Sequence, residues 1–265
     1  MTTLSQIQEQ FNNRIDREER IGYVLLLLWV LTMITLPIAK WTIGEQAIPF
    51  GINLAAVLQA SAVFALVQHQ WGWRRTIMAF VTVAIITWLA EFVGHRTNFP
   101  FGAYEYTTRL QPQVGGVPLL IPIAWFMLLP SSWVMAQMIV GERDTWVKRG
   151  AFVAMSAVAL TAWDLFLDPQ MVNWEFWIWE NPSGYFGIPL SNYAGWLLVS
   201  AVVTVAVNPP RLNVMPLALV YGVVWFLQTI GQAFFWGQVG PAIVGCLAMG
   251  SIMLIAYWRN RRSPA

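Results

Sequence analysis

Two pairs of ionisable side chains stand at the ends of long apolar stretches of this 265-residue chain. Glu91 and His95 form the first pair, and Asp164 and Asp168 form the second. Residues four apart lie on one face of a helix, so each pair presents both side chains to the same neighbour. Ionisable groups at membrane depth cost roughly 2.5–3.5 kcal/mol each and usually mark function. We therefore expect these groups to converge on one cavity.

Paired carboxyl groups in an apolar cavity can supply acid–base chemistry. A carboxyl group beside hydrocarbon holds its proton more tightly than one in water, and two neighbouring carboxyls separate into an acid and a carboxylate. The acid can protonate an alkene, while the second group orients a water molecule and accepts its proton. We assign Asp164 as the acid, with Glu91 as the alternative. Asp168 or His95 would then orient the water molecule and accept its proton.

Some of these residues also have simpler explanations. A proline follows Asp168, so this aspartate could merely mark the end of a helix. His95 could be a solvated loop residue, and its neighbour Arg96 a counter-ion for a carboxylate. Glu91 and Asp164 are harder to dismiss, because each lies within an apolar run.

Aromatic and amide side chains near the two pairs are candidates for binding a substrate. The faces of Trp and Tyr rings attract cations, by ~2 kcal/mol where water is excluded. Two tyrosines follow a Pro-Phe-Gly turn that either folds them back over the cavity or anchors the loop, and an asparagine either binds water or caps a helix. The candidates are Trp88, Tyr104, Tyr106, Trp163, Asn192 and Trp196.

The composition requires a membrane environment. Hydrophobic residues make up 57% of the chain and charged residues 11%, and the mean hydropathy is +0.56. An ordinary soluble domain has roughly a quarter charged residues, so this chain cannot cover a soluble surface. The same values exclude disorder. The net charge of +2 and the scattered basic residues exclude a nucleic-acid partner.

Apolar windows of about 20 residues predict an all-α, polytopic transmembrane helix bundle. We expect eight spans, with seven as the alternative because only Trp236-Gly237-Gln238 separate the last two. The chain would then consist of an N-terminal segment (1–20), a single transmembrane domain (21–258) and a tail (259–265). The predicted spans are Ile21–Ala39, Phe50–Gln68, Thr76–Phe92, Leu119–Val140, Ala151–Leu167, Ser191–Val207, Val214–Phe234 and Val239–Trp258.

The basic residues predict the orientation. Of the 15 Lys and Arg residues, only Lys40, Arg96 and Arg109 fall on one side of the predicted bundle. The others fall with both termini, and cytoplasmic segments carry the excess of Lys and Arg. We therefore expect a protein of the cytoplasmic (inner) membrane with both termini in the cytoplasm.

Two long connections, Val93–Pro118 and Asp168–Leu190, then lie on the non-cytoplasmic side. The second contains Trp174, Trp177 and Trp179. Amphipathic indoles favour the membrane interface. This connection is therefore predicted to lie across the bilayer surface as a lid, with an ordinary aromatic belt as the alternative for some of its tryptophans.

Two segments of the chain are similar in sequence to each other. Gly116-Val117-Pro118-Leu119 and Gly187-Ile188-Pro189-Leu190 each open a predicted span, and each is followed by a tryptophan, Trp125 or Trp196. Each string also follows one of the polar pairs at a similar distance. We interpret the two helix–loop–helix units as a parallel repeat. Chance similarity is the alternative, because Gly-x-Pro strings are common where helices start.

Several strings, taken in order between about residues 85 and 200, resemble the integral-membrane carotenoid 1,2-hydratases. This family includes the bisanhydrobacterioruberin hydratases and the γ-carotene/lycopene hydratases. The strings are Glu91…Gly94-His95, Pro100-Phe101-Gly102-x-Tyr104-x-Tyr106, Gly116-Val117-Pro118…Pro122…Trp125, Asp164-Leu165-x-x-Asp168-Pro169, Trp177-x-Trp179 and Gly187-Ile188-Pro189…Asn192…Gly195-Trp196.

The resemblance implies addition of water across the terminal C1–C2 double bond of an acyclic (ψ) carotenoid end. Protonation at C2 gives a tertiary cation at C1, which water captures as a tertiary alcohol. This chemistry requires no redox cofactor and no metal. The carotenoid would enter from the bilayer, among membrane lipids, and a glycosyltransferase is the expected partner that acts on the product. Lycopene, γ-carotene and a C50 carotenoid remain open as substrates.

Three other functions compete with this interpretation. The Asp164-x-x-x-Asp168 spacing resembles the shorter Asp-rich motif of membrane prenyltransferases, but the matching position reads Glu91-x-x-x-His95 and that face has few cations for a diphosphate. The same four residues could instead bind a divalent metal ion that activates water. A carotenoid or lipid carrier would bind its ligand without converting it.

Overall fold

The computed structural model describes residues 17–262. It contains eight helices that are long and apolar enough to cross a membrane, which confirms the predicted all-α bundle. Residues 1–16 and 263–265, which hold most of the predicted N-terminal segment and part of the tail, lie outside the described residues. The helices are α2 (Arg17–Ile43), α3 (Ala47–Trp71), α4 (Trp73–Thr97), α5 (Leu120–Val140), α6 (Trp146–Asn173), α7 (Leu190–Val207), α8 (Val214–Ile230) with the π-helical turn η1 (Gly231–Phe235), and α9 (Val239–Arg262).

Each helix contains most of one predicted span, and several helices run further than predicted. Helix α4 continues to Thr97, and α6 extends from Trp146 to Asn173. An apolar window detects only the part of a helix that matches the hydrocarbon core, whereas the backbone hydrogen bonds continue into the interface. The residues at the ends of these helices therefore remain helical although their side chains are more polar.

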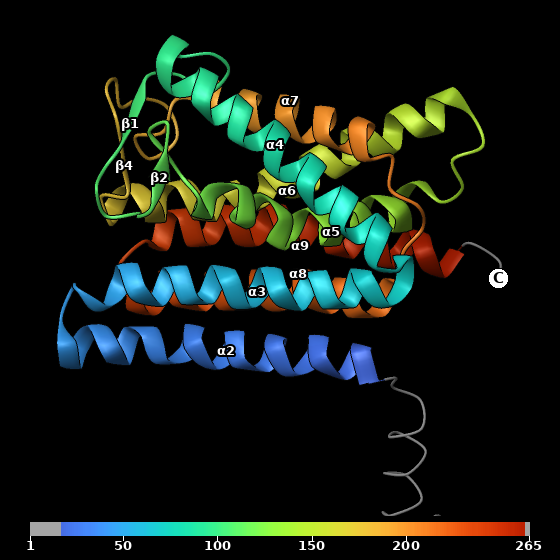
Figure 1. The fold of residues 1–265 in the computed structure, drawn as a ribbon, viewed down its shortest axis with the longest axis horizontal. Coiled ribbons are helices and arrows are strands. Elements are labelled where there is room, and N and C mark those ends of the chain that lie inside the picture. Colours follow the sequence, from blue (N-terminus) through green and yellow to red (C-terminus); the bar gives the residue numbers. More distant parts are fainter. Residues whose placement is uncertain (1–16, 263–265) are drawn as a thin grey trace, which may run out of the picture.

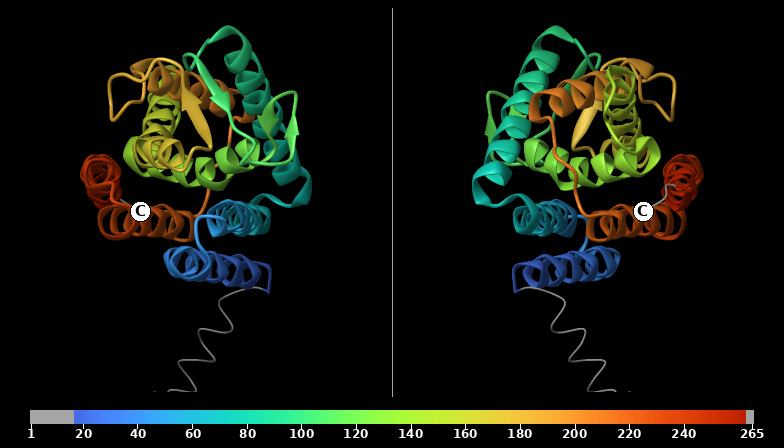
Figure 2. Two further views of the ribbon diagram at one scale, coloured as in Figure 1. Left: turned by 90° about the vertical axis from the view of Figure 1, so that its left-hand side faces the viewer. Right: turned by 90° about the vertical axis from the view of Figure 1, so that its right-hand side faces the viewer.

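The helices pack in layers around a central helix. Helix α2 lies outermost and packs chiefly on α3, which lies beside α8 in the next layer (Figure 1). The end views in Figure 2 show α4, α5, α6 and α7 grouped together beyond them, with α9 at the side. Helix α5 contacts most of the others and is apolar on all faces, as a helix in the core of a bundle should be.

Helix α6 continues through Pro169, so the expectation that this proline ends the helix after Asp168 is wrong. A proline inside a helix leaves the carbonyl four residues earlier without its donor. Here the Tyr185 hydroxyl donates to that carbonyl, of Leu165, at 3.1 Å. Gln232 Nε2, from η1, donates to the next carbonyl at 2.7 Å. These outside donors keep Asp168 on a helical turn.

The two long connections are joined by a small antiparallel sheet. Strand β1 (Tyr104–Tyr106) comes from the first connection and β4 (Trp177–Trp179) from the second. A short hairpin, β2 (Gln113–Val114) with β3 (Val117–Pro118), lies beside them. The β1–β4 register places Tyr104 opposite Trp179, Glu105 opposite Ile178 and Tyr106 opposite Trp177.

The three tryptophans of the second connection point into the protein. Trp174, Trp177 and Trp179 are only 3%, 8% and 4% exposed. The alternative of an ordinary aromatic belt is therefore wrong for these three residues. Strand alternation places Trp177 and Trp179 on one side of β4, and pairing with β1 turns that side towards the helices.

Equivalent residues of the two helix–loop–helix units contact each other, as they would across a two-fold axis. Glu105 and Ile178, which face each other at the centre of the sheet, are separated by the same number of residues as Glu91 and Asp164. The tryptophans that follow the two Gly-x-Pro strings stack with their ring centroids 4.1 Å apart and an interplanar angle of 11°. Two units related by an axis along the bundle would make such contacts, which supports their interpretation as a repeat.

A glycine in α7 allows the loop before β1 to approach closely. A Cβ at Gly195 would lie 2.6 Å from the Phe101 ring and 2.9 Å from the Pro100 carbonyl oxygen. Gly195→Ala should therefore lower the free energy of unfolding by about 1–3 kcal/mol, measured by thermal unfolding in detergent. Gly150→Ala in α6 is the control, because no atom lies within 4 Å of that Cβ position. Equal melting temperatures for the two variants would contradict the prediction.

Candidate active site

A small cavity of about 30 Å³ lies between α4, α5, α6 and α7, beneath the β1–β4 sheet. It combines two carboxyl groups, an amide and two phenols with indole rings and a few aliphatic side chains. We call it the polar chamber. Its lining consists of Glu91, Phe101, Tyr104, Tyr106, Ile121, Ala124, Trp125, Leu167, Asp168, Trp177, Trp179, Asn192 and Trp196.

Strand β1 holds the carboxyl group of Glu91, which is only 5% exposed. The hydroxyls of Tyr104 and Tyr106 donate to its Oε2 atom at 2.5 and 2.8 Å. Residues two apart on a strand share a face, so the Tyr-x-Tyr spacing delivers both hydroxyls to one oxygen. Burial and the nearby Glu91 raise the pKa of both tyrosine hydroxyls, which therefore remain donors at neutral pH. Neither tyrosine donates a hydrogen bond to the other carboxyl oxygen of Glu91, Oε1.

Strand β4 and α7 hold the carboxyl group of Asp168. The indole N–H groups of Trp177 and Trp179 donate to its Oδ1 atom at 2.6 and 3.4 Å. The Asn192 side-chain amide donates to Oδ2 at 2.5 Å. Three N–H donors thus surround the two oxygens of this one carboxyl group. The two paired strands thus supply phenols to one carboxyl group and indoles to the other.

Asp164 lies behind this arrangement. Its Oδ2 atom accepts a hydrogen bond from the Asn192 amide at 2.9 Å, so Asn192 bridges the two aspartates. Asp164 is fully buried and does not line the polar chamber. Its Oδ1 atom has no hydrogen-bond partner among the described residues. The structure therefore places this predicted acid beside the chamber and not in its wall.

Stacked indoles form one wall of the polar chamber. The rings of Trp125 and Trp196 are parallel, and Trp163 packs edge-on against Trp196 at 6.0 Å. Trp125 adjoins Glu91, and its buried indole N–H has no hydrogen-bond partner among the described residues. Trp125 and Trp196 thus line the same chamber as the two carboxyl groups, and Trp163 supports Trp196 from outside the lining.

The polar chamber includes six of the ten predicted site residues and leaves four outside its lining. Trp88 stacks on Phe92 at 4.9 Å and donates to a carbonyl of β2. His95 adjoins Gly116, where an added Cβ would lie 2.9 Å from His95 Nε2. Four residues along a helix correspond to about 6 Å of rise, which carries His95 past the chamber to the level of the β2–β3 hairpin. Asp164 and Trp163 are the other two.

Seven residues that line the polar chamber were not predicted from the sequence, and three of them are tryptophans, namely Trp125, Trp177 and Trp179. The Trp-x-Trp spacing matches the Tyr-x-Tyr spacing of β1 and occupies a comparable place in the repeat. That match was a signal that both strands present their ring donors to one centre. For Trp125, the signal in the sequence was its position in the first unit, which is equivalent to that of Trp196 in the second unit.

The geometry bears on two of the competing functions. Within residues 17–262, no group of three or more His, Cys, Asp or Glu side chains is arranged to hold a metal ion. The lining of the polar chamber has no lysine or arginine that could bind a diphosphate. Arg109, at the same end of the bundle, donates instead to the Trp174 carbonyl at 2.6 Å.

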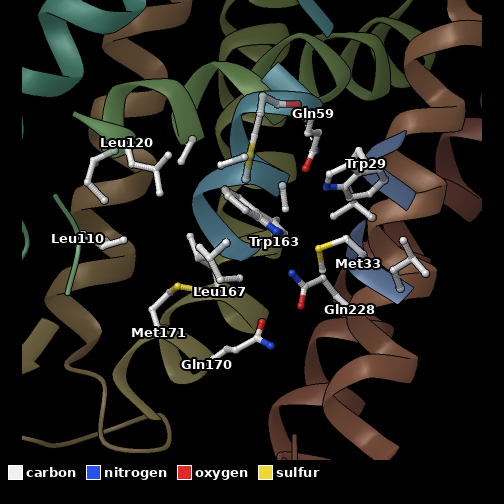
Figure 3. A pocket seen from close by; sticks show the side chains of 18 of the residues that line it. Trp29, Met33, Gln59, Leu110, Leu120, Trp163, Leu167, Gln170, Met171 and Gln228 are labelled. Carbon is white, nitrogen blue, oxygen red and sulfur yellow. Dashed lines mark hydrogen bonds between the residues drawn. The ribbon is translucent and has the colours of Figure 1, made fainter. Parts of the chain in front are cut away.

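A larger apolar cavity adjoins the polar chamber. This apolar chamber has a volume of about 70 Å³, and its walls come largely from α2, α3, α5, α6 and α8. Figure 3 shows Trp163 between Leu167 on one side and Trp29 and Met33 of α2 on the other. The two chambers are continuous in their lining, because they share Ile121, Ala124, Leu167 and Trp177.

Comparisons with known proteins place these residues within a matched region. Residues 51–252, which contain the whole polar chamber, match the family described as "Carotenoid biosynthesis protein". The chain is 30% identical over 183 residues to the bisanhydrobacterioruberin hydratase of Haloarcula japonica. That alignment covers 69% of this chain and 59% of the relative, so the chain spans less than two thirds of the relative's length. No solved structure matches the chain significantly.

The indole N–H of Trp177 should stabilise the fold through Asp168. Trp177→Phe removes a donor at 2.6 Å and leaves a buried carboxyl group short of one partner. We expect a loss of about 1–3 kcal/mol in the free energy of unfolding, measured by thermal unfolding in detergent. Trp174→Phe is the matched control, because the buried Trp174 N–H has no hydrogen-bond partner among the described residues. A larger loss in the control than in Trp177→Phe would contradict this role.

Proposed function

Because this chain belongs to the carotenoid biosynthesis protein family, we propose that it is a membrane hydratase that adds water to the terminal C1–C2 double bond of an acyclic carotenoid end. The observation that carries this proposal is the pair of carboxyl groups, Glu91 and Asp168, that line one chamber with different donors. The tertiary alcohol produced is a group that a glycosyltransferase could modify.

Glu91 is the proposed acid. Oε2 accepts both tyrosine hydrogen bonds, so the proton is carried on Oε1 and passes to C2 of the alkene. The carboxylate that remains is stabilised by the same two hydroxyls, which lowers the free energy of the ion pair formed in this step. We prefer Glu91 to Asp164, the first choice from sequence, because Asp164 does not line the polar chamber.

Protonation at C2 leaves a tertiary cation at C1. The indole faces of Trp125 and Trp196, in the wall of the polar chamber, would attract this cation by ~2 kcal/mol where water is excluded. The carboxylate of Asp168 adds a charge of opposite sign on the same chamber. These groups stabilise charge that develops only during the reaction, which is the requirement for catalysis.

Asp168 is the proposed base. An ionised carboxyl group has about four acceptor positions, and Asp168 uses three of them for Trp177, Trp179 and Asn192. The remaining position can hold a water molecule. As the oxygen of this water bonds to C1, its proton passes to Asp168 and returns through solvent to Glu91. The net change is alkene plus water to alcohol, with no oxidation or reduction.

The apolar chamber is the proposed site of the polyene. A long hydrocarbon cannot dissolve in water and would enter from the bilayer, with its terminal double bond reaching the polar chamber past Ala124 and Leu167. Burial of apolar surface supplies the binding energy, roughly 25 cal/mol per Å². Lycopene, γ-carotene and a C50 carotenoid share the required end group.

We also propose that the polar chamber lies towards the outer face of the cytoplasmic membrane. Most of the Lys and Arg residues fall at the end of the bundle where the described chain begins and ends. Positively charged segments favour the cytoplasm. The polar chamber is at the opposite end, next to the β1–β4 sheet.

Removing either carboxyl group of the polar chamber should abolish most of the activity. In a lycopene-producing bacterial host, Glu91→Gln and Asp168→Asn should lower the yield of hydroxylated carotenoid by roughly 10²–10⁴-fold, measured by chromatography. Asp164→Asn is the control at a neighbouring carboxyl group outside the lining and should retain more activity than either. Wild-type yield from Glu91→Gln would contradict its role as the acid.

Isotope labelling separates a hydratase from a carrier. Membranes that contain the protein are incubated with lycopene in H₂¹⁸O, and the product is analysed by mass spectrometry. A hydratase incorporates one ¹⁸O into the alcohol, whereas a carrier returns the carotenoid unchanged. If lycopene is bound but not converted, the same assay is repeated with γ-carotene and a C50 carotenoid. Failure with every substrate would overturn the proposed reaction.

Ala124 lies where the two chambers share a wall. Ala124→Phe should narrow this passage and lower product yield at least tenfold, because the reactive end can no longer reach the carboxyl groups. Ala151→Phe, at an exposed position of α6, is the matched control and should leave the yield unchanged. Full activity of correctly folded Ala124→Phe would show that the carotenoid takes another path.

A further inference from the structure

A wide groove runs between α6 and α7 at the end of the bundle opposite the polar chamber. Its volume is about 780 Å³. Small and aliphatic side chains line much of its length, including Ala154 of α6 with Ala201 and Val205 of α7. Gly150 leaves further space, because no atom lies within 4 Å of the position that its Cβ would occupy. A groove of this kind between two membrane-spanning helices faces acyl chains.

Two arginines stand at the mouth of this groove. Arg143 lies over the Phe152 ring, 4.3 Å from its centroid, and Arg149 lies 5.1 Å from the centroid of Trp146. Arg149 Nε donates to the Arg143 carbonyl at 3.2 Å, which holds the two residues together. Arg143 Nη1 also donates to the Pro209 carbonyl at 2.8 Å. A guanidinium group has five N–H donors, so others on both arginines are available to an anion.

The charges around these arginines are unbalanced. The nearest acidic residues are engaged elsewhere, because Glu142 pairs with Arg211 and Asp144 pairs with Lys148 at 2.9 Å. Within the described part of the chain, neither groove arginine makes an ion pair. Partial burial and repulsion from Arg211 lower the pKa of the Arg143 guanidinium. The N-terminus of α6, at the same place, adds the positive end of the helix dipole.

The surroundings of the groove mouth are those of a membrane interface. Trp146 is 84% exposed and the adjacent Val147 is 81% exposed, at the first turn of α6. Indole rings favour the level of the lipid head groups. The two guanidinium groups therefore lie at the depth where phospholipid phosphates occur, directly above an apolar groove.

We propose that this groove binds an anionic phospholipid, with the phosphate between Arg143 and Arg149 and one acyl chain along α6 and α7. Guanidinium groups form paired hydrogen bonds with phosphate oxygens, and basic pockets between membrane helices recognise anionic head groups. The apolar floor favours a lipid over a soluble anion, which would gain nothing from it. This site is separate from the polar chamber and does not depend on the proposed reaction.

Native mass spectrometry of the protein released from lipid nanodiscs tests this site. The nanodiscs contain equal amounts of phosphatidylglycerol and phosphatidylcholine, and retained lipid is counted. The wild-type protein should retain phosphatidylglycerol in preference. The double variant Arg143→Gln/Arg149→Gln should retain about tenfold less of it. Arg259→Gln/Arg261→Gln, in α9, makes the same change in charge and should behave like the wild type. Equal losses in both double variants would overturn the site.

A second variant distinguishes a lipid from free phosphate. Gly150→Leu fills the groove without changing its charge, and it should weaken retention of phosphatidylglycerol severalfold. Titration of the wild type with inorganic phosphate alone should show much weaker binding. Phosphate binding that equals lipid binding, with Gly150→Leu unchanged, would replace the lipid by a soluble anion. If the double arginine variant does not fold, Arg149→Gln alone should still reduce retention, and wild-type retention in that variant would also overturn the proposal.

Discussion

Two carboxyl groups buried inside a helix bundle need hydrogen-bond donors, and this requirement organises the end of the molecule that contains them. Four of the five donors come from β1 and β4, which belong to connections far apart in the sequence. Each strand turns alternate aromatic residues towards the helices. The sheet is too short to be stable alone, so its rings and the carboxyl groups stabilise each other.

Helix α6 meets the same requirement in a different way. Asp168 reaches its donors only because the helix continues through Pro169, and the backbone groups disturbed there bond to side chains of the second connection and of η1. Asn192 completes the arrangement by donating to both aspartates of α6. Polar side chains of the second connection, α7 and η1 thus hold both the backbone and the carboxyl groups of this part of α6.

The proposed reaction depends on the position of the polar chamber next to the apolar one, because it needs carboxyl groups beside a binding site for hydrocarbon. In the proposed reaction, a carboxylic acid beside hydrocarbon can protonate an alkene only if the alkene is delivered to it. Ile121 and Ala124 line both chambers, and we propose that the alkene passes them. The predicted resemblance to the carotenoid hydratase family is confirmed by the matches over most of the chain. The proposed roles of acid and base rest on the different donors: phenols that bond to one oxygen of Glu91, and N–H groups that surround Asp168.

The sequence by itself determined the membrane class, the number of spans and the family, and it singled out Glu91 and Asp168 as candidates, because apolar windows, motifs and helical spacing are local properties. The tertiary structure alone decided which groups meet. It placed Asp164 behind Asn192 and His95 beside Gly116, outside the lining of the polar chamber. It also turned the tryptophans of β4 inward, since strand pairing between distant segments sets the direction of a side chain and no local pattern specifies the partner strand.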